Sequence, residues 1–149
     1  MADAKPDPPT VVIVDSLQDT LDMLRCALEN AGFRVVEAGV DDLRHAAGDL
    51  AAFAVEQGAT VIVYDVSLPY ETNWRTVQAC LAIPALADVG FIVTTTNEVA
   101  IYDLVGPSDN LQVIGKPYEL REVVEAVSRA ARRGANDRRA VQSAMMRRV

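Results

Sequence analysis

The sequence predicts an α/β domain built on a doubly wound, five-stranded parallel sheet. Short apolar stretches alternate with amphipathic segments along most of the chain. The stretches at 11–14 and 60–64 are almost entirely apolar, as expected of strands that are buried on both faces of a parallel sheet. In the segments between the strands, apolar residues recur three or four positions apart, which predicts the helical crossovers that parallel strands require.

The elements follow from these patterns in chain order. Strands are predicted at 11–14, 33–37, 60–64, 91–95 and 111–114. The first helix is indicated by leucines spaced four, three and four residues apart from Leu17 to Leu28, and Gly32 stops it. Further helices are predicted at 41–57, 73–82 and 98–105. A last amphipathic helix starts at Leu120, and its continuation past Gly134 into the tail is left open.

The length and composition suit a single domain. The chain has 149 residues, of which 50% are hydrophobic, enough for one core. No apolar run reaches the roughly 18 residues of a membrane span, and the polar start does not resemble a signal peptide. We therefore expect a cytoplasmic protein without membrane contact, divided into a disordered leader (1–10), a domain (11–131) and a basic tail or helix extension (132–149). Cys26 and Cys80 lie in apolar helical patterns and are expected to be small core residues.

The net charge of −7 combines an acidic body with a basic tail. Residues 129–149 contain seven arginines and one acid, a charge of +6, so residues 1–128 carry −13. Such a body repels nucleic acid and favours cations or basic partners. Only the tail is expected to contact phosphates or acidic surfaces, so nucleic-acid binding is not expected of the domain.

Charged and polar residues follow the predicted strands at one edge of the sheet, where functional groups gather in folds of this class. Acids come after the first strand (Asp15 and, one loop later, Asp19) and at the end of the third (Asp65). Three threonines at 94–96 end the fourth strand. Lys116 follows the fifth strand, and the chain has only one other lysine.

These residue types suit phosphoryl transfer to a carboxylate. An aspartate can act as a nucleophile and form an aspartyl phosphate. The transferring group is highly charged, so the site needs cations, which a lysine and a divalent metal supply. Clustered acids suit Mg²⁺, which prefers oxygen ligands and keeps several waters. A threonine hydroxyl can donate to a phosphoryl oxygen.

Four segments resemble the receiver domain of bacterial two-component response regulators. They are VVIVD at 11–15, YDVSLP at 64–69, the threonine-ended strand at 91–95 and IGKPYEL at 114–120. The most specific features are Asp65 with Pro69 four residues later, Thr95 thirty residues after Asp65, and the pair Lys116 and Pro117. The resemblance covers residues 11–131 and implies a strand order of 2-1-3-4-5 and a cis bond between Lys116 and Pro117.

The resemblance also implies roles for individual residues. Asp65 would accept a phosphoryl group from a histidine kinase or a phosphotransfer protein. Thr95 and Lys116 would sense the phosphoryl group, and Asp15, Asp65 and the backbone carbonyl of Ser67 would bind Mg²⁺. With no room for an output domain, the chain would signal by binding a downstream protein or by forming a homodimer.

The match is atypical around the acidic pocket. Ser16 stands where the family usually has the acid that binds the metal directly, so Mg²⁺ binding is expected to be weak or absent. Asp19 lies one helical turn on, although an N-cap or surface role is the simpler expectation for it. The loop at 70–74 lacks the usual glycines, and Thr96 replaces a small residue and could narrow the pocket. Val113 stands where many relatives carry a switching aromatic residue.

Two functions stay open. The first is a stand-alone receiver that is phosphorylated on Asp65, and the second is a pseudo-receiver that uses the same fold for binding or dimerisation without phosphate. A turnover enzyme is not expected, because a dehalogenase-like phosphatase needs a second acid where Ser67 stands, and the loop after the first strand lacks the glycine of a flavin site. His45 is expected to be a surface or packing residue, and Trp74 a partly buried helix residue.

Overall fold

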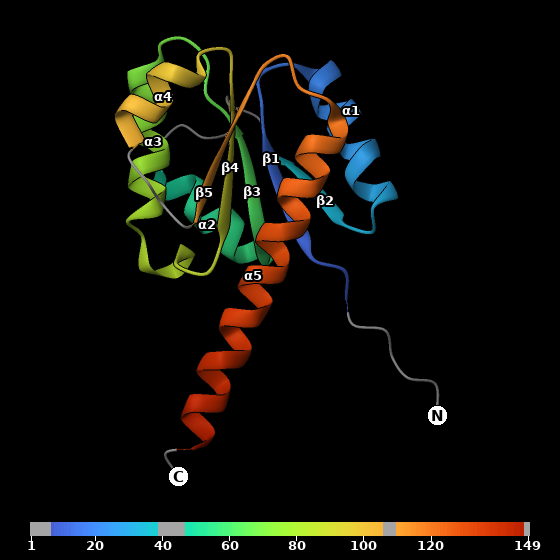
Figure 1. Ribbon diagram of the computed structural model, residues 1–149, viewed down its shortest axis with the longest axis vertical. Coiled ribbons are helices and arrows are strands. Elements are labelled where there is room, and N and C mark those ends of the chain that lie inside the picture. Colours follow the sequence, from blue (N-terminus) through green and yellow to red (C-terminus); the bar gives the residue numbers. More distant parts are fainter. Residues whose placement is uncertain (1–6, 39–46, 106–109, 148–149) are drawn as a thin grey trace.

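The computed structural model describes residues 7–38, 47–105 and 110–147 and contains a five-stranded sheet with helices on both faces (Figure 1). The strands are β1 (Thr10–Val14), β2 (Arg34–Ala38), β3 (Ala59–Asp65), β4 (Gly90–Thr95) and β5 (Leu111–Gly115). All neighbouring strands are parallel, and their order is β2-β1-β3-β4-β5. The predicted fold class and strand order are confirmed.

The helices follow the predicted alternation with the strands. They are α1 (Gln18–Asn30), α2 (Ala47–Gln57), α3 (Tyr70–Leu81), α4 (Glu98–Val105) and α5 (Leu120–Met146), with a short 3-10 helix, η2, at Pro84–Leu86. α3 begins at Tyr70, with Pro69 at its N-cap, earlier than the predicted start at 73, because residues 70–72 contain no glycine or proline to interrupt the helix. α5 continues through Gly134, so the predicted last helix does extend into the tail. Part of the helix predicted at 41–57 lies outside the described residues, and so does His45.

Side chains alternate between the two faces of each strand, so the sheet supplies two cores. On one face, Ile62 and Phe91 belong to a core that includes residues of α2, α3 and α4. On the other face, Val63 and Ile92 pack with residues of α1 and α5. This alternation decides which side chains can meet at the ends of the strands.

The two cysteines differ in burial. Cys80 on α3 is buried as predicted, and burial raises the pKa of its thiol to about 11. The prediction for Cys26 is wrong, because this side chain is exposed. α1 buries Leu24 and Leu28, and a residue midway between them lies on the opposite side of a helix. Trp74 is more buried than predicted, with 3% of its surface exposed.

The start of the described chain joins the sheet. β1 begins at Thr10, inside the segment predicted as a disordered leader, and the Pro9 carbonyl accepts a hydrogen bond from the Arg34 N–H at 2.9 Å. The rest of that segment, residues 1–6, lies outside the described part. Among the described helices, none combines the length and the apolar character needed to cross a membrane.

Candidate functional site

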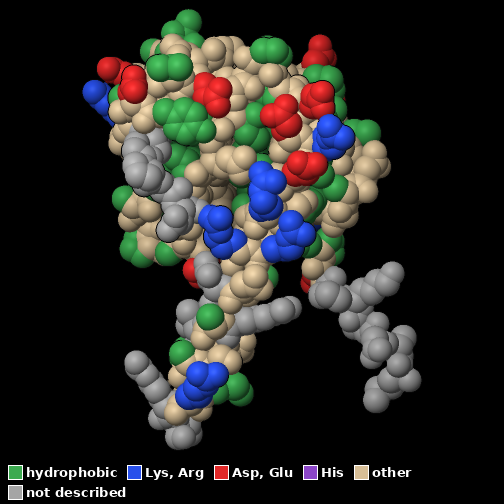
Figure 2. Space-filling view, in the orientation of Figure 1, with side chains coloured by type: hydrophobic (Ala, Val, Ile, Leu, Met, Phe, Trp, Pro, Cys, Tyr) green, Lys and Arg blue, Asp and Glu red, His purple; other side chains and the backbone are tan. Residues whose placement is uncertain are grey.

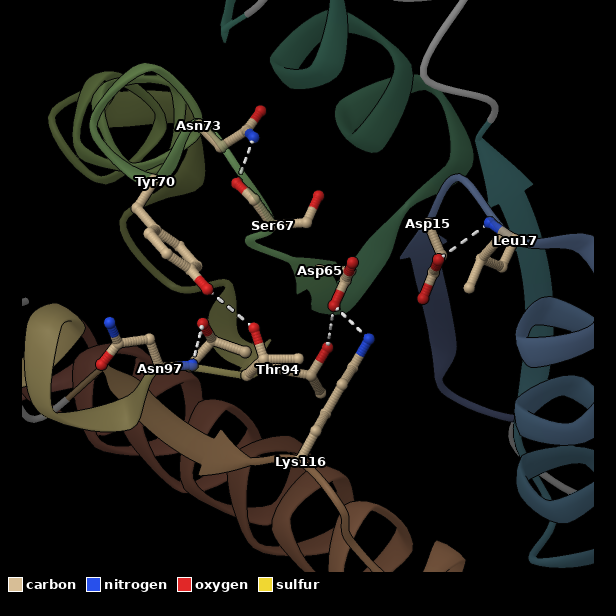
Figure 3. A network of polar contacts seen from close by, with 11 residues as sticks. Asp15, Leu17, Asp65, Ser67, Tyr70, Asn73, Thr94, Asn97 and Lys116 are labelled. Atoms are coloured by element: carbon tan, nitrogen blue, oxygen red, sulfur yellow. Dashed lines mark hydrogen bonds and ion pairs between the residues drawn. The ribbon is translucent and has the colours of Figure 1, made fainter.

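The carboxyl edge of the sheet brings Asp65, Thr94 and Lys116 together (Figure 3). The Lys116 Nζ lies 2.6 Å from the Asp65 Oδ1. The Thr94 hydroxyl donates a hydrogen bond to the same oxygen at 3.0 Å. The side chain of Asp65 is only 7% exposed and that of Lys116 is 23% exposed, so this ion pair is largely shielded from water. A carboxylate, a hydroxyl and an ammonium therefore converge at one point.

Strand alternation explains this convergence. Val63 and Ile92 face α1 and α5, so the residues two positions later, Asp65 and Thr94, point to the same side of the sheet. Asp65 and Thr94 are also partners in the β3–β4 register. Lys116 follows β5 and reaches them from the next strand along.

Thr95 is the residue predicted to sense the phosphoryl group. It lies on the face of β4 opposite to Thr94. It is fully buried, and its hydroxyl oxygen accepts a hydrogen bond from the Asn97 N–H at 3.2 Å. Its carbonyl accepts from the Lys116 N–H at 2.7 Å, which fixes the backbone at the end of β5. Sequence reasoning missed Thr94 as the residue that contacts the acid. No sequence signal could have found it, because β4 is apolar on both faces and only the pairing of Thr94 with Asp65 in the sheet separates the two threonines.

The start of α5 holds the segment after Lys116 in place. The Lys116–Pro117 peptide bond is cis, as predicted. Glu119 caps α5, with its N–H donating to the Glu122 carboxylate at 3.2 Å in a capping box. The chain therefore turns directly from the lysine into a capped helix.

Asp15 adds a second carboxylate to the pocket from the end of β1. It is 4% exposed, and its Oδ1 accepts a hydrogen bond from the Leu17 N–H at 3.0 Å. Burial raises the pKa of Asp15, and the charge of Asp65 adds to the rise, while the Leu17 bond and Lys116 oppose it. Two shielded carboxylates thus lie near each other beside one ammonium, an arrangement that a divalent cation stabilises.

The other predicted acidic-pocket positions lie apart from this group. Ser16 and Asp19 are exposed, and within the described residues neither forms a hydrogen bond with the Asp65 side chain. The N-cap of α1 is Leu17, so Asp19 is not the cap but an acid in the first turn. There it interacts favourably with the positive end of the helix dipole.

The third predicted metal ligand is the backbone carbonyl of Ser67, which already accepts one hydrogen bond. The Ser67 carbonyl accepts a hydrogen bond from the Asn73 side-chain amide at 2.7 Å, which leaves one lone pair. Among the described residues, no group of three or more His, Cys, Asp or Glu side chains is placed to hold a metal. Mg²⁺ usually keeps several waters and needs only one or two carboxylates. The carboxylates of Asp15 and Asp65 therefore suit a sparsely ligated Mg²⁺, whereas the Ser67 carbonyl points toward Asn73 (Figure 3).

A hydrogen bond between Tyr70 and Thr96 lies beside the pocket (Figure 3). Their hydroxyl groups are 2.8 Å apart and join the start of α3 to the loop after β4. Thr96 itself is exposed. This bond holds Thr96 at the surface, and a narrowing of the approach to the pocket stays a prediction.

Tyr102 lies near Val113, whereas Tyr118 packs on the other face of the sheet. Val113 is buried, and the Tyr102 hydroxyl of α4 donates to its carbonyl at 3.4 Å. Tyr118 is half-buried, and burial raises its pKa, with further contributions from the charges of Asp15 and Asp65. The phenol of Tyr118 therefore stands close to the acidic pocket.

Similar solved structures are response regulator receivers. A receiver domain protein from Methanospirillum hungatei shares 19% identity, with 87% of this chain and 98% of that chain covered, at a TM-score of 0.66. A receiver protein from Sinorhizobium medicae shares 17%, covering 85% and 96%, at 0.64. A chemotaxis response regulator of Vibrio cholerae shares 20%, covering 83% and 98%, at 0.62. No family model and no curated protein matches the sequence. The chain has the fold of response regulator receiver domains.

Proposed function

We propose that the chain is a receiver whose Asp65 accepts a phosphoryl group from a phosphohistidine of a histidine kinase or a phosphotransfer protein. The observation that supports this best is the convergence of Lys116 and Thr94 on the Oδ1 of Asp65. Within the described residues, the side-chain hydrogen bond to Asp65 goes to Oδ1 and none goes to Oδ2. That oxygen is therefore available as the nucleophile.

In the proposed step, the Oδ2 of Asp65 attacks phosphorus and forms an O–P bond. The P–N bond to the donor imidazole breaks, and the imidazole nitrogen keeps the electron pair. Lys116 then balances the charge of the phosphoryl oxygens, and the Thr94 hydroxyl donates to one of them in the role first assigned to Thr95. Mg²⁺ held by Asp15 and Asp65 would supply the further positive charge that transfer of such an anionic group requires.

The signal would pass through protein contacts in the cytoplasm, to a downstream partner or to a second copy of the chain. Exposed apolar side chains of α4, among them Val99 and Tyr102, offer a surface for such a contact. Asp65 is modified rather than returned unchanged in each cycle, so we propose no turnover reaction of the chain's own.

The test is labelling of the purified chain with acetyl phosphate, with and without Mg²⁺, read by intact mass. We expect the parent to gain one phosphoryl group only with Mg²⁺, and Asp65→Asn to gain none. Asp19→Asn, which neutralises an exposed acid on α1, is the matched control and should label like the parent. Equal labelling of the parent and Asp65→Asn would remove Asp65 from its role.

A pseudo-receiver, acting as a binding or dimerisation module without phosphate, is the second candidate. It is favoured by the exposed Ser16 in place of an acid, by the Asn73 amide on the Ser67 carbonyl and by the Tyr70–Thr96 bond beside the pocket. This candidate predicts no labelling of the parent and no change of its melting temperature with Mg²⁺. Labelling that depends on both Mg²⁺ and Asp65 would exclude it.

A further inference from the structure

A cavity of about 260 Å³ opens at the amino edge of the sheet, the end opposite Asp65. The first residues of β4 and β5 line it together with α5 and the loop before β4. Its polar lining residues are Asp88, Asn110, Gln112, Arg129 and Arg133. The cavity is therefore polar, and its lining carries one more positive than negative charge.

The arginines of this cavity are not neutralised by acids. Arg129 and Arg133 are four residues apart on α5 and so lie on the same side of the helix. Within the described residues neither forms an ion pair, whereas the Nε of Arg25 lies 3.0 Å from Glu37. Arg129 donates one N–H to the Gln112 Oε1 at 3.3 Å, which leaves further guanidinium donors for a ligand. Figure 2 shows Lys and Arg side chains gathered over α5 near the point where it leaves the body.

Two glycines bring α5 close to the sheet at this cavity. A Cβ at Gly90 would lie 2.8 Å from the Ala130 Cβ, and a Cβ at Gly134 would lie 3.2 Å from the Asp88 carbonyl oxygen. Side chains at these positions would push the helix away from the strand ends. The close approach lets α5 and the starts of β4 and β5 line one cavity.

We propose that this cavity binds a small phosphate-bearing ligand that also carries a hydroxyl or ammonium group. Arginine guanidinium groups bind phosphate oxygens through pairs of N–H donors, and Arg129 and Arg133 supply two such groups. The amide of Gln112 adds a neutral donor. Asp88 is exposed at the rim of the cavity, and a hydroxyl or ammonium of the ligand would give its carboxylate a hydrogen-bond donor that a bare phosphate ester lacks. The cavity is smaller than the roughly 300–1,000 Å³ of sites for drug-sized ligands, so the ligand is smaller than a nucleotide.

The experiment is calorimetric titration of the full chain with glycerol 3-phosphate, inorganic phosphate and succinate. We expect saturable binding of glycerol 3-phosphate, with weaker binding of inorganic phosphate and of the dicarboxylate. Arg129→Gln and Arg133→Gln should each weaken the binding of glycerol 3-phosphate by about tenfold, because each removes a charged hydrogen-bond donor. Asp88→Asn should lower the preference for glycerol 3-phosphate over inorganic phosphate, because it removes the charged acceptor for the hydroxyls and also the repulsion of the bare anion.

Arg132→Gln is the matched control. Arg132 is exposed on the same turn of α5 and carries the same charge, but it does not line the cavity. We expect this variant to bind within about twofold of the parent, since only long-range attraction changes. Thermal melts establish that each variant is folded.

Two results would overturn the proposal. One is the absence of saturable binding for all three probes. The other is an equal loss of affinity in Arg132→Gln and Arg133→Gln, which would reduce the site to general attraction by a basic helix. Neither outcome depends on phosphorylation of Asp65, because the cavity lies at the other edge of the sheet and binding is read without a phosphodonor.

Discussion

The two edges of the sheet use positive charge in different ways. At the carboxyl edge, Lys116 is held against the nearly buried carboxylate of Asp65. At the amino edge, Arg129 and Arg133 line a cavity, and no acid of the described residues pairs with them. The body is acidic overall, so net charge does not distinguish these sites. The two edges therefore differ in what lies beside the cation, a buried carboxylate at one and an open cavity at the other, and not in the charge of the body.

The largest expected effect comes from breaking the ion pair of the carboxyl edge. Lys116→Met leaves the Asp65 carboxylate, 7% exposed, without its cation. Leaving a buried charge unpaired costs about 3–5 kcal/mol, and the partial exposure of Lys116 lowers our expectation to about 2 kcal/mol. We expect this loss in the free energy of unfolding, measured by urea denaturation at pH 7, together with loss of labelling by acetyl phosphate.

Arg121→Met is the control for this variant. Arg121 pairs with Glu119 at 3.4 Å, but both side chains are more than 70% exposed. Exposed pairs contribute little, so the expected change is less than about 0.5 kcal/mol. Equal losses of stability in the two variants would mean that shielding the Lys116–Asp65 pair from water does not increase its contribution to stability.

A pair of glycine substitutions compares the tightness of packing at the two edges. In Gly90→Ala the new Cβ meets the Ala130 Cβ at 2.8 Å, which is fixed to the α5 backbone, so the helix must shift. Such overpacking costs about 1–3 kcal/mol. In Gly115→Ala the new Cβ meets the Glu98 Oε2 at 2.5 Å, the end of a flexible side chain that turns aside at lower cost. Urea denaturation should therefore show the larger loss for Gly90→Ala, and the reverse order would contradict the assigned packing.

The pH dependence of stability tests the role of Asp15 at the carboxyl edge. Because burial raises its pKa, the folded state binds this proton more tightly than the unfolded state, and the ionised carboxylate lowers stability above the folded-state pKa. Asp15→Asn removes the charge and keeps an acceptor for the Leu17 N–H. Without Mg²⁺, we expect the variant to be more stable than the parent at pH 7. The advantage should shrink as the pH falls toward the ordinary value of 3.8, and urea denaturation that shows it growing on acidification would refute this account.

The smallest expected effect concerns the approach to the pocket. Tyr70→Phe removes the hydroxyl that bonds to Thr96 and frees the loop after β4. Labelling by acetyl phosphate should accelerate by no more than about fivefold, the equivalent of one net hydrogen bond. Tyr102→Phe removes a hydroxyl that bonds to the Val113 carbonyl instead, and it should leave the labelling rate unchanged. A slower labelling rate in Tyr70→Phe than in the parent would contradict the prediction that the Tyr70–Thr96 bond narrows the approach to the pocket.

Much of the fold could be predicted because a strand covered on both faces must be apolar along its whole length. This rule located β1 and β3 from 11–14 and 60–64, and the acids and the lysine after the strands then marked the carboxyl edge. The rule does not show which face a strand-end residue occupies. Thr94 and Thr95 are chemically identical neighbours, and only the register that pairs Thr94 with Asp65 separates them.

Contacts between distant loops could not be predicted from the sequence, for a related reason. The bond between Tyr70 and Thr96 depends on where α3 begins, and the bond between Asn73 and Ser67 depends on the turn that precedes it. The cavity at the amino edge needs the packing of α5 on β4, which a count of basic residues does not reveal. The spacing of apolar residues predicts helices and strands. Contacts between side chains of different elements depend on how the sheet and the helices pack together.

α5 extends twelve residues beyond Gly134 to Met146 and projects past the end of the sheet (Figure 1). At about 1.5 Å per residue, this part of the helix is a lever about 18 Å long. A rotation of the packed half by about 10° would move the far end by about 3 Å. The packed half covers the same face of the sheet toward which Asp65 and Thr94 point. A small change of packing on that face would thus cause a larger displacement at the far end of α5, at a distance from the pocket.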